Sequence, residues 1–272
     1  MVRRGEGPDF IEALARGLDV IRAFHADRPR MTLAEVAAAT GLARPTARRI
    51  LLTLGELGYV RAEDGGFLLT PRVLDLGMAY VGALGLWDLA RPHMQELVRQ
   101  TGESSSMTQL DGADIVYVAR VAVPKIIALR VEIGTRFPAV PTSQGKVLLA
   151  ALGRVDLDRV LATPSRSGIT PRVTHSRAEI DAMLRDVRAK GWALADDELA
   201  RGIRSVAVPV RDGAGEVRAA MNVTVHSAET SVKTLIEQHL PALLRAASAI
   251  SADWASWQSR PIDVAEPSLT RG

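Results

Sequence analysis

Arginine and hydroxyl side chains gather on one short segment, and their spacing suits contact with nucleic acid. Guanidinium groups bind phosphate oxygens and the acceptor edge of guanine, and threonine hydroxyls bind several base edges. Such a face could also be a solvated helix surface, so the surrounding elements have to decide. The polar residues of this segment are Arg44, Thr46, Arg48, Arg49 and Thr53.

The residues around this segment predict a helix-turn-helix. Thr32 and Glu35 have the T-x-x-E spacing of a capping box, which starts a first helix. Gly41 supplies the tight turn, and Pro45 suits the first turn of the second helix, where its missing N–H costs nothing. The residues expected to face inward from the second helix are Ile50, Leu51, Leu54 and Leu57.

A two-stranded wing is expected after the second helix. Residues 59–61 and 67–69 are the strand candidates, and the turn between them contains Gly65-Gly66. Arg61 would let this wing reach phosphates or the minor groove. The partner implied is double-stranded DNA, and the residues predicted to bind it are Thr32, Arg44, Thr46, Arg48, Arg49, Thr53 and Arg61.

The composition describes an ordinary globular protein with modest charge. The 272 residues are 47% hydrophobic and 24% charged, which excludes a disordered chain. The net charge is only +3, so the local arginine cluster has to carry the argument for DNA. No segment approaches the roughly 20 apolar residues that span a bilayer. We therefore expect a soluble cytoplasmic protein, associated with the nucleoid when it is bound to DNA.

Catalysis, metals and cofactors are not expected. The chain has no cysteine, and its five histidines lack the spacing of a zinc motif. Ser143, Asp196 and His226 are the residue types of a catalytic triad, but no G-x-S-x-G elbow surrounds a serine. There is also no P-loop and no G-x-G-x-x-G. The sequence predicts no catalytic residue, no metal ligand and no cofactor.

The order of elements predicts an α+β fold. Asp9 with Glu12 is expected to cap a first helix. Residues 71–87 are expected to form an apolar helix, which either packs on a second copy or covers the first domain. Beyond residue 88, strands in a meander, one over 126–131, alternate with helices, which favours an antiparallel sheet. Pro92 is expected in the first turn of a helix, and Pro241 is expected to interrupt the last helical run, 231–257. The predicted parts are a winged helix-turn-helix domain, 9–70, a linker helix, 71–87, an effector-binding domain, 88–258, and a loose tail, 259–272.

A ligand site is expected where polar residues of the second domain converge. Asn222, Thr224 and His226 alternate with apolar residues, so they share one face of a strand, which lines a cavity or faces solvent. Ser143 and Gln144 open a capped helix, whose free amides and positive dipole end could cradle a carboxylate. Further polar groups that could converge there are Asp196, Glu198, Arg204 and Ser205.

Two longer segments resemble the IclR-type bacterial transcription regulators. They read G-T-R-F-P-A-V-P-T-S-Q-G-K-V-L-L-A and G-I-R-S-V-A-V-P-V-R-D, and the resemblance spans residues 9–257. Residues 10–18, 142–146 and 220–226 are similar to the subgroup that controls aromatic catabolism through the β-ketoadipate pathway. Members of that subgroup respond to protocatechuate, 4-hydroxybenzoate or β-ketoadipate.

The resemblance implies a GAF-like effector domain and a homodimer able to pair into a homotetramer. By position, the resemblance implies that the effector-binding residues are Ser143, Gln144, Asp196, Ser205, Asn222 and Thr224. His226 is added to this set on the basis of strand alternation alone. Two positions depart from the family pattern: Ala43 stands where many relatives have serine, and Gln144 where methionine or alanine is usual. The second departure could alter which acid fits.

The function predicted is that of a sequence-specific DNA-binding transcription regulator that responds to a small carboxylic acid, either aromatic or β-ketoadipate. Two alternatives remain open from the sequence. One is an IclR-type regulator of another small-acid pathway, and the other is a ligand-independent DNA-binding protein.

Overall fold

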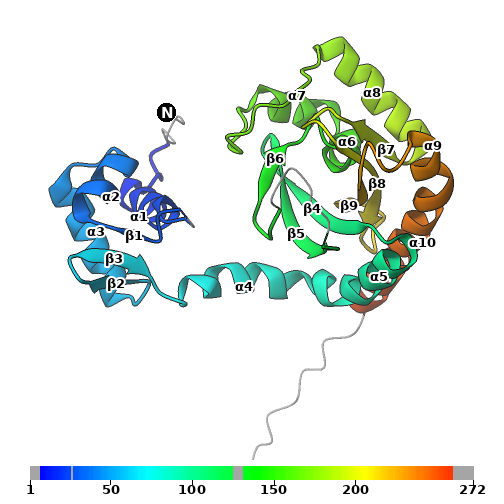
Figure 1. Cartoon of the computed structure of the whole chain (residues 1–272). Coiled ribbons are helices and arrows are strands. Elements are labelled where there is room, and N and C mark those ends of the chain that lie inside the picture. Colours follow the sequence, from blue (N-terminus) through cyan, green and yellow to red (C-terminus); the bar gives the residue numbers. More distant parts are fainter. Residues whose placement is uncertain (1–6, 26, 125–130, 260–272) are drawn as a thin grey trace, which may run out of the picture. The chain divides into compact units, whose positions relative to one another are not determined.

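A computed structural model describes residues 7–25, 27–124 and 131–259, without the side chains of residues 78, 79 and 81–84. The chain divides into two compact units, residues 1–83 and 84–272 (Figure 1). The strand expected over 126–131 lies, apart from Val131, outside the described residues, and so does the tail from residue 260. No described helix combines the length and the apolar character needed to cross a membrane.

The N-terminal unit is a winged helix-turn-helix. Its helices are α1 (Glu12–Ala23), α2 (Leu33–Thr40), α3 (Arg44–Glu56) and α4 (Val73–Leu84), the last of which ends one residue inside the second unit. Its strands are β1 (Arg30–Met31), β2 (Val60–Glu63) and β3 (Gly66–Leu69), and they form an antiparallel sheet of order β1-β3-β2. The predicted architecture of this unit is confirmed.

Local signals in the N-terminal unit have the expected geometry. Thr32 and Glu35 form both halves of the capping box, and Gly41 adopts the left-handed conformation, with φ 66°. The core packs Val20 of α1 against Val36 of α2 and Leu51 of α3. Helices α2 and α3 are thereby held at the turn by apolar burial, which leaves their outer faces free.

Three local expectations about this unit are wrong. Helix α1 has no side-chain cap: its N-cap residue is Ile11, because Phe10 donates its N–H to Gly7 in a preceding turn that includes Asp9. Leu57 does not face inward; it ends α3 and is 51% exposed, since the chain turns there toward the wing. The linker helix begins at Val73 rather than at residue 71.

The C-terminal unit is an α+β domain around one antiparallel sheet of order β6-β5-β4-β9-β8-β7. Its strands are β4 (Ser104–Asp111), β5 (Asp114–Val121), β6 (Arg136–Pro138), β7 (Ala193–Asp196), β8 (Ile203–Arg211) and β9 (Val217–His226). Its helices are α5 (Leu86–Thr101), α6 (Ser143–Ala150), α7 (Arg154–Ala162), α8 (Arg177–Lys190), α9 (Val232–Thr234) and α10 (Leu240–Gln258), with a π-helical turn at Leu235–His239. The α+β class with an antiparallel sheet is confirmed.

Two prolines sit differently from what the sequence suggests. Helix α5 begins at Leu86, so Pro92 lies inside the helix, beyond its first turn. The earlier start follows from the burial of Leu86 and Trp87, which the apolar core holds in helical conformation. Near the C-terminus the change of helix type, at Leu235–His239, precedes Pro241, which lies in the first turn of α10.

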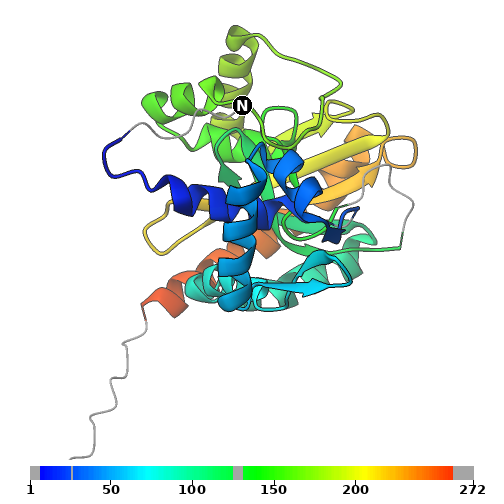
Figure 2. The same cartoon turned by 90° about the vertical axis from the view of Figure 1, so that its left-hand side faces the viewer.

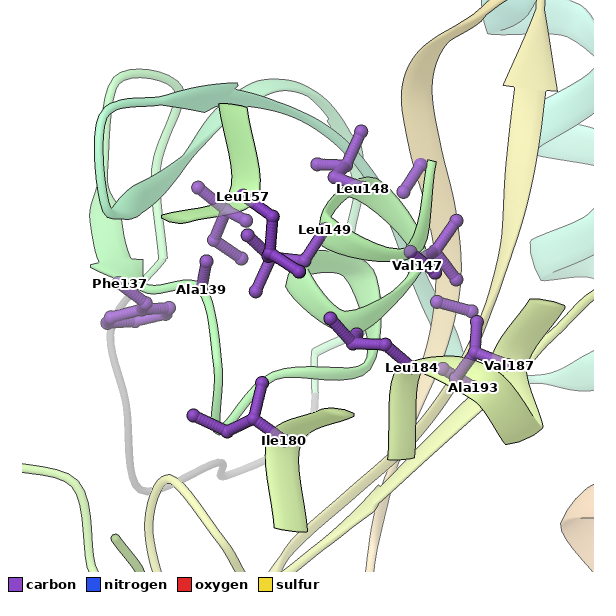
Figure 3. Packing of buried hydrophobic residues seen from close by; sticks show 14 of the residues in the cluster. Phe137, Ala139, Val147, Leu148, Leu149, Leu157, Ile180, Leu184, Val187 and Ala193 are labelled. Carbon is purple, nitrogen blue, oxygen red and sulfur yellow. The ribbon is translucent and has the colours of Figure 1, made fainter. Parts of the chain in front are cut away.

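Helices cover both faces of this sheet. Helix α6 contacts β8 and β9 on one face, and α10 contacts β8 and lies beside α5 on the other (Figures 1 and 2). Every residue of α6 is buried, and Leu149 packs among Leu157 of α7 and Ile180 of α8 (Figure 3). A Cβ atom at Gly145 would lie 2.0 Å from the carbonyl oxygen of Ala139, so only glycine fits there. The start of α6 is therefore fixed against the sheet.

Candidate functional site

The polar residues predicted to contact DNA spread around the outer half of α3. Arg44 and Arg48 are exposed and lie one helical turn apart. Thr46, Arg49 and Thr53 instead line a groove toward α1. The structure therefore splits the predicted set on α3 between two neighbouring faces.

The remaining two predicted DNA contacts lie outside α3. Thr32 is exposed at the start of α2, where its side chain accepts the N–H of Glu35. Arg61 is exposed on β2 and pairs with Glu63 of the same strand at 3.0 Å. A phosphate would have to compete with this carboxylate for Arg61.

An apolar groove, the α1–α3 groove, accompanies the DNA-binding motif. Its volume is about 710 Å³, and its lining includes Leu14, Leu18, Leu57 and Leu76. Leu14 is 62% exposed and Leu18 is 47% exposed. Large apolar side chains gathered at one exposed surface are typical of an association surface.

The C-terminal unit holds a second site, a polar cavity between the sheet and the start of α6. Its polar lining residues are Tyr117, Arg120, Thr142, Gln144, Ser205, Asn222 and Thr224, and its apolar ones include Phe137, Ala195, Leu199 and Ile203. Four of the predicted effector residues, Gln144, Ser205, Asn222 and Thr224, thus line one cavity. Ser143 adjoins it, because its hydroxyl lies 2.7 Å from that of Ser205.

Side-chain amides tie the walls of the polar cavity to one another. Gln144 donates to the backbone carbonyl of Ser106 at 3.1 Å, which joins α6 to β4. Asn222 accepts the N–H of Ser106 at 3.0 Å and donates to the hydroxyl of Thr224 at 2.8 Å. Ser205 and Thr224 therefore retain hydroxyl capacity that a ligand could use.

Two predicted effector residues are not brought into this cavity. Asp196 follows Ala195, which lines the cavity, so alternation along β7 turns its carboxylate away, where it pairs with Arg204 at 2.7 Å. His226 ends β9 and accepts the N–H of Ala228 at 3.2 Å through its Nδ1. Neither residue belongs to the lining.

Arg120 is a cavity residue that the sequence reasoning missed. In the β4–β5 ladder Met107 pairs with Ala119 whereas Thr108 pairs with Tyr117, so Val118 is an extra, bulged residue. The bulge shifts the alternation by one, which lets Tyr117 and Arg120 face the same cavity although they are three positions apart. Strict alternation would have placed them on opposite faces, so no local signal points to Arg120.

The guanidinium of Arg120 carries a charge into the polar cavity without a carboxylate partner among the described residues. Its Nη1 donates to the hydroxyl of Ser106 at 3.0 Å. Burial lowers the pKa of Arg120, and the adjacent Tyr117 opposes this shift. A bound anion would offset the cost of desolvating this cation.

Aromatic side chains form one wall of the polar cavity. The rings of Tyr117 and Phe137 meet edge to face, with centroids 5.6 Å apart. Burial raises the pKa of Tyr117 to about 12, so its phenol stays neutral at physiological pH. A cation, several hydroxyls and an aromatic wall together suit a planar anion.

The residue types of a catalytic triad, Ser143, Asp196 and His226, are not brought together in the described part of the chain. Ser143 meets the hydroxyl of Ser205 and has no histidine partner in the contacts of the described chain. Within the described ranges, no group of three or more histidine, aspartate or glutamate side chains is placed to hold a metal ion.

Two family models match this chain, one within the N-terminal unit and one that begins near the end of that unit and covers most of the C-terminal unit. Residues 13–64 match the IclR helix-turn-helix domain, and residues 78–252 match the model described as "Bacterial transcriptional regulator IclR C-terminal". These matches fall on the winged motif and on the unit that contains the polar cavity.

Characterised relatives cover most of the chain. The Pca regulon regulatory protein of Pseudomonas putida is 39% identical over 240 residues, which are 88% of this chain and 82% of that protein. The p-hydroxybenzoate hydroxylase transcriptional activator of Acinetobacter baylyi is 34% identical, over 89% of this chain and 91% of that protein.

Solved structures share the fold. A putative transcriptional regulator from Rhodococcus sp. RHA1 is 46% identical, with a TM-score of 0.78 over 91% of this chain and all of that one. An IclR homolog from Microbacterium hydrocarbonoxydans, solved as a complex with 4-hydroxybenzoate, is 24% identical, with a TM-score of 0.77 over 90% of this chain and 99% of that one.

Proposed function

Since the chain belongs to the IclR family of bacterial transcription regulators, we propose that its polar cavity binds an aromatic carboxylic acid and that this binding controls its action on DNA. The winged helix-turn-helix is the part that contacts DNA. The proposal concerns which signal the C-terminal unit senses.

The observation that carries the proposal is the position of Arg120. It is the cation among the lining residues, and no described carboxylate neutralises it. A carboxylate bound there would accept charge-assisted hydrogen bonds in a site partly shielded from water. Ser205 and Thr224 would orient the acid, with Gln144, Asn222 and the neighbouring Ser143 holding the walls.

An aromatic acid suits the cavity better than an aliphatic one. The edge-to-face pair of Tyr117 and Phe137 offers a flat apolar contact to a ring. The names of two relatives, a Pca regulon regulator and a p-hydroxybenzoate hydroxylase activator, support phenolic acids as candidates. The acids to test first are 4-hydroxybenzoate and protocatechuate, with β-ketoadipate as the aliphatic comparison.

The DNA contacts are proposed to come from α3 and the wing. Arg44 and Arg48 would meet one side of the major groove, while Arg49 and the two threonines, Thr46 and Thr53, would meet the other. Thr32 and Arg61 would contact the backbone from the start of α2 and from the wing.

A second copy of the chain is proposed to cover the apolar part of the α1–α3 groove, formed by Leu14, Leu18 and Leu76, while the lining residues Thr46, Arg49 and Thr53 remain available to DNA. Exposed leucines and a volume of about 710 Å³ support an association surface there. A homodimer would present two winged motifs to two half-sites, and pairs of dimers would give a homotetramer. The parts proposed are a DNA-binding domain over residues 9–70, the linker helix α4 and an effector-binding domain that begins with α5 at Leu86 and ends at residue 258. The protein would act in the cytoplasm, on the nucleoid, and would not be an enzyme.

Calorimetry with matched ligands tests the effector proposal. We expect 4-hydroxybenzoate or protocatechuate to bind, and 4-hydroxybenzamide to bind at least about tenfold more weakly because it lacks the charge that Arg120 recognises. Equal binding of acid and amide would contradict the role of Arg120.

The same experiment separates the alternatives. Binding of another small acid in place of these would favour a regulator of a different pathway. DNA binding in a gel shift that none of the acids changes, with no heat in calorimetry, would favour a ligand-independent DNA-binding protein.

A further inference from the structure

We propose that the segment between β7 and β8, residues 197–202, is a lid over the polar cavity and that Glu198 latches it closed. We call these residues the lid segment. The proposal rests on the proposed function and adds how the effector enters.

The size of the polar cavity requires a wall to move. Its volume is about 40 Å³. An engineered protein cavity that takes up benzene measures about 150 Å³. An aromatic acid is larger than benzene, so it cannot enter unless part of the lining is displaced.

Most of the lining is held by regular structure. Strands β8 and β9 pair along the cavity, and every residue of α6 is buried, with Val147–Ala150 in the hydrophobic cluster of Figure 3. Thr142 caps α6 by accepting the N–H of Gly145 at 3.1 Å. These elements cannot shift without breaking a sheet or a packed core, which is costly.

The lid segment, by contrast, is irregular chain that contributes an apolar plug. Leu199 lines the cavity and is 8% exposed. Asp197 and Gly202, at the two ends of the segment, have positive φ angles of 54° and 83°. The segment closes on itself, since Gly202 donates its N–H to the carboxylate of Asp197 at 2.9 Å. Such a compact loop can swing as one piece.

Glu198 fastens the lid segment from two sides. One of its carboxylate oxygens is paired with the ammonium of Lys146 on α6, and the other lies 2.9 Å from Nε2 of His175. The side chains of Lys146 and Glu198 are 4% and 15% exposed. Lys146 also donates to the carbonyl of Leu194 at 2.8 Å. A shielded pair anchored on a fixed helix resists opening more than a surface pair does.

Backbone contacts beside Glu198 complete the closure. Val173 donates its N–H to the carbonyl of Glu198 at 3.0 Å, and Arg172 donates to that of Leu199 at 3.2 Å. These bonds join the lid segment to another irregular stretch, which ends at His175. Release of Glu198 would therefore leave the segment held by these backbone bonds and, at its first residue, by the contacts of Asp197 with Arg172 at 3.4 Å and with the hydroxyl of Ser227 at 3.1 Å.

An introduced thiol measures the opening without any effector. The chain has no cysteine, so Leu199→Cys places a single thiol on the lid segment itself, at the position that lines the cavity. Its reaction rate with iodoacetamide, a small neutral reagent, follows the open population. We expect Glu198→Gln to raise this rate at least about tenfold, because the neutral amide loses the charged partner.

Two controls separate local opening from general loosening. Val206→Cys puts the thiol in the middle of β8, at a fully buried position, and should react equally slowly with and without Glu198→Gln. Asp253→Asn removes the carboxylate of another histidine pair, His93–Asp253 at 2.7 Å, and should leave the Leu199→Cys rate unchanged.

Effector kinetics give the second readout. In the otherwise native chain, Glu198→Gln should speed both association and dissociation of 4-hydroxybenzoate by about the same factor as the thiol reaction. If Glu198→Gln does not change the reaction rate of the thiol in Leu199→Cys, the lid proposal is contradicted, whichever acid binds. Failure of every acid to bind would instead contradict the proposed function while the thiol result still decides the lid.

Discussion

Arg120 of β5 donates a hydrogen bond to the hydroxyl of Ser106 on the neighbouring strand β4, across 3.0 Å. Serine satisfies one N–H of the guanidinium but leaves its charge uncompensated. Because the other lining residues of the polar cavity are neutral, Arg120 gives the cavity its positive charge, and we expect the cavity to favour anions for this reason.

Replacement of Arg120 by methionine should weaken effector binding while the fold is retained. A hydrogen bond to a charged group contributes about 1.5–3 kcal/mol, so we expect a loss of about 10- to 100-fold in the affinity measured by calorimetry. Arg218→Met is the matched control, since Arg218 pairs with Asp212 at 2.6 Å and does not line the cavity. Equal losses in both variants would contradict the assignment.

Gly145→Ala should destabilise the C-terminal unit strongly. The added Cβ would lie 2.0 Å from the backbone oxygen of Ala139, which cannot move aside as a flexible side chain would. We expect a loss of about 3 kcal/mol or more in the free energy of unfolding, measured with urea. Gly153→Ala, which meets nothing within 4 Å, should change it by less than about 1 kcal/mol.

The arginines of α3 should differ in how they affect DNA binding. Arg48→Ala and Arg49→Ala are compared by gel shift on the promoter beside the gene, at several salt concentrations. A base-reading arginine should cost about 1–3 kcal/mol and relax specificity at one position, whereas a phosphate contact should reduce the salt slope by about 1. Arg185→Ala, on α8, is the control. Unchanged binding in both variants would refute the placement of α3 in the groove.

Leu18→Glu should shift the chain from dimer to monomer in sedimentation velocity. Leu18 lines the α1–α3 groove and is about half exposed, so the charge is tolerated in a monomer but not under a second copy. Val155→Glu, at an exposed site on α7, should leave the oligomeric state as it is. A dimer that survives Leu18→Glu would place the association surface elsewhere.

The capping box of α2 should stabilise the N-terminal unit near neutral pH and lose this stabilising effect in acid. Hydrogen bonds from the backbone and hydroxyl of Thr32 hold the pKa of Glu35 below its ordinary value of 4.5. The folded state thus binds fewer protons than the unfolded state in this range. The stabilisation is complete above pH 4.5 and is lost as the pH falls through the lowered pKa.

Thermal unfolding of Glu35→Gln at different pH values measures this effect. The difference in midpoint between the native chain and the variant should be constant near neutrality and should shrink toward zero in acid. In a Thr32→Ala background, Glu35→Gln should have little effect at any pH, since the partner is gone. A difference that persists in strong acid would contradict the assignment.

The sequence by itself determined the elements whose signals are local. The capping boxes at Thr32 and Ser176 join residues three apart, so they form wherever a helix starts there. Gly41 and Gly191 end their helices in the left-handed conformation for the same local reason. Alternation along β9 likewise placed Asn222 and Thr224 on one face, and this was enough to find one wall of the polar cavity.

Only the tertiary structure decided which side chains meet inside that cavity. A single bulged residue, Val118, turned Arg120 inward, and the pairing of β7 turned Asp196 outward. The contact of Lys146 with Glu198 joins residues 52 positions apart. Such contacts depend on the register of strands and on the packing of α6 against the sheet, and a periodic pattern in the sequence contains neither.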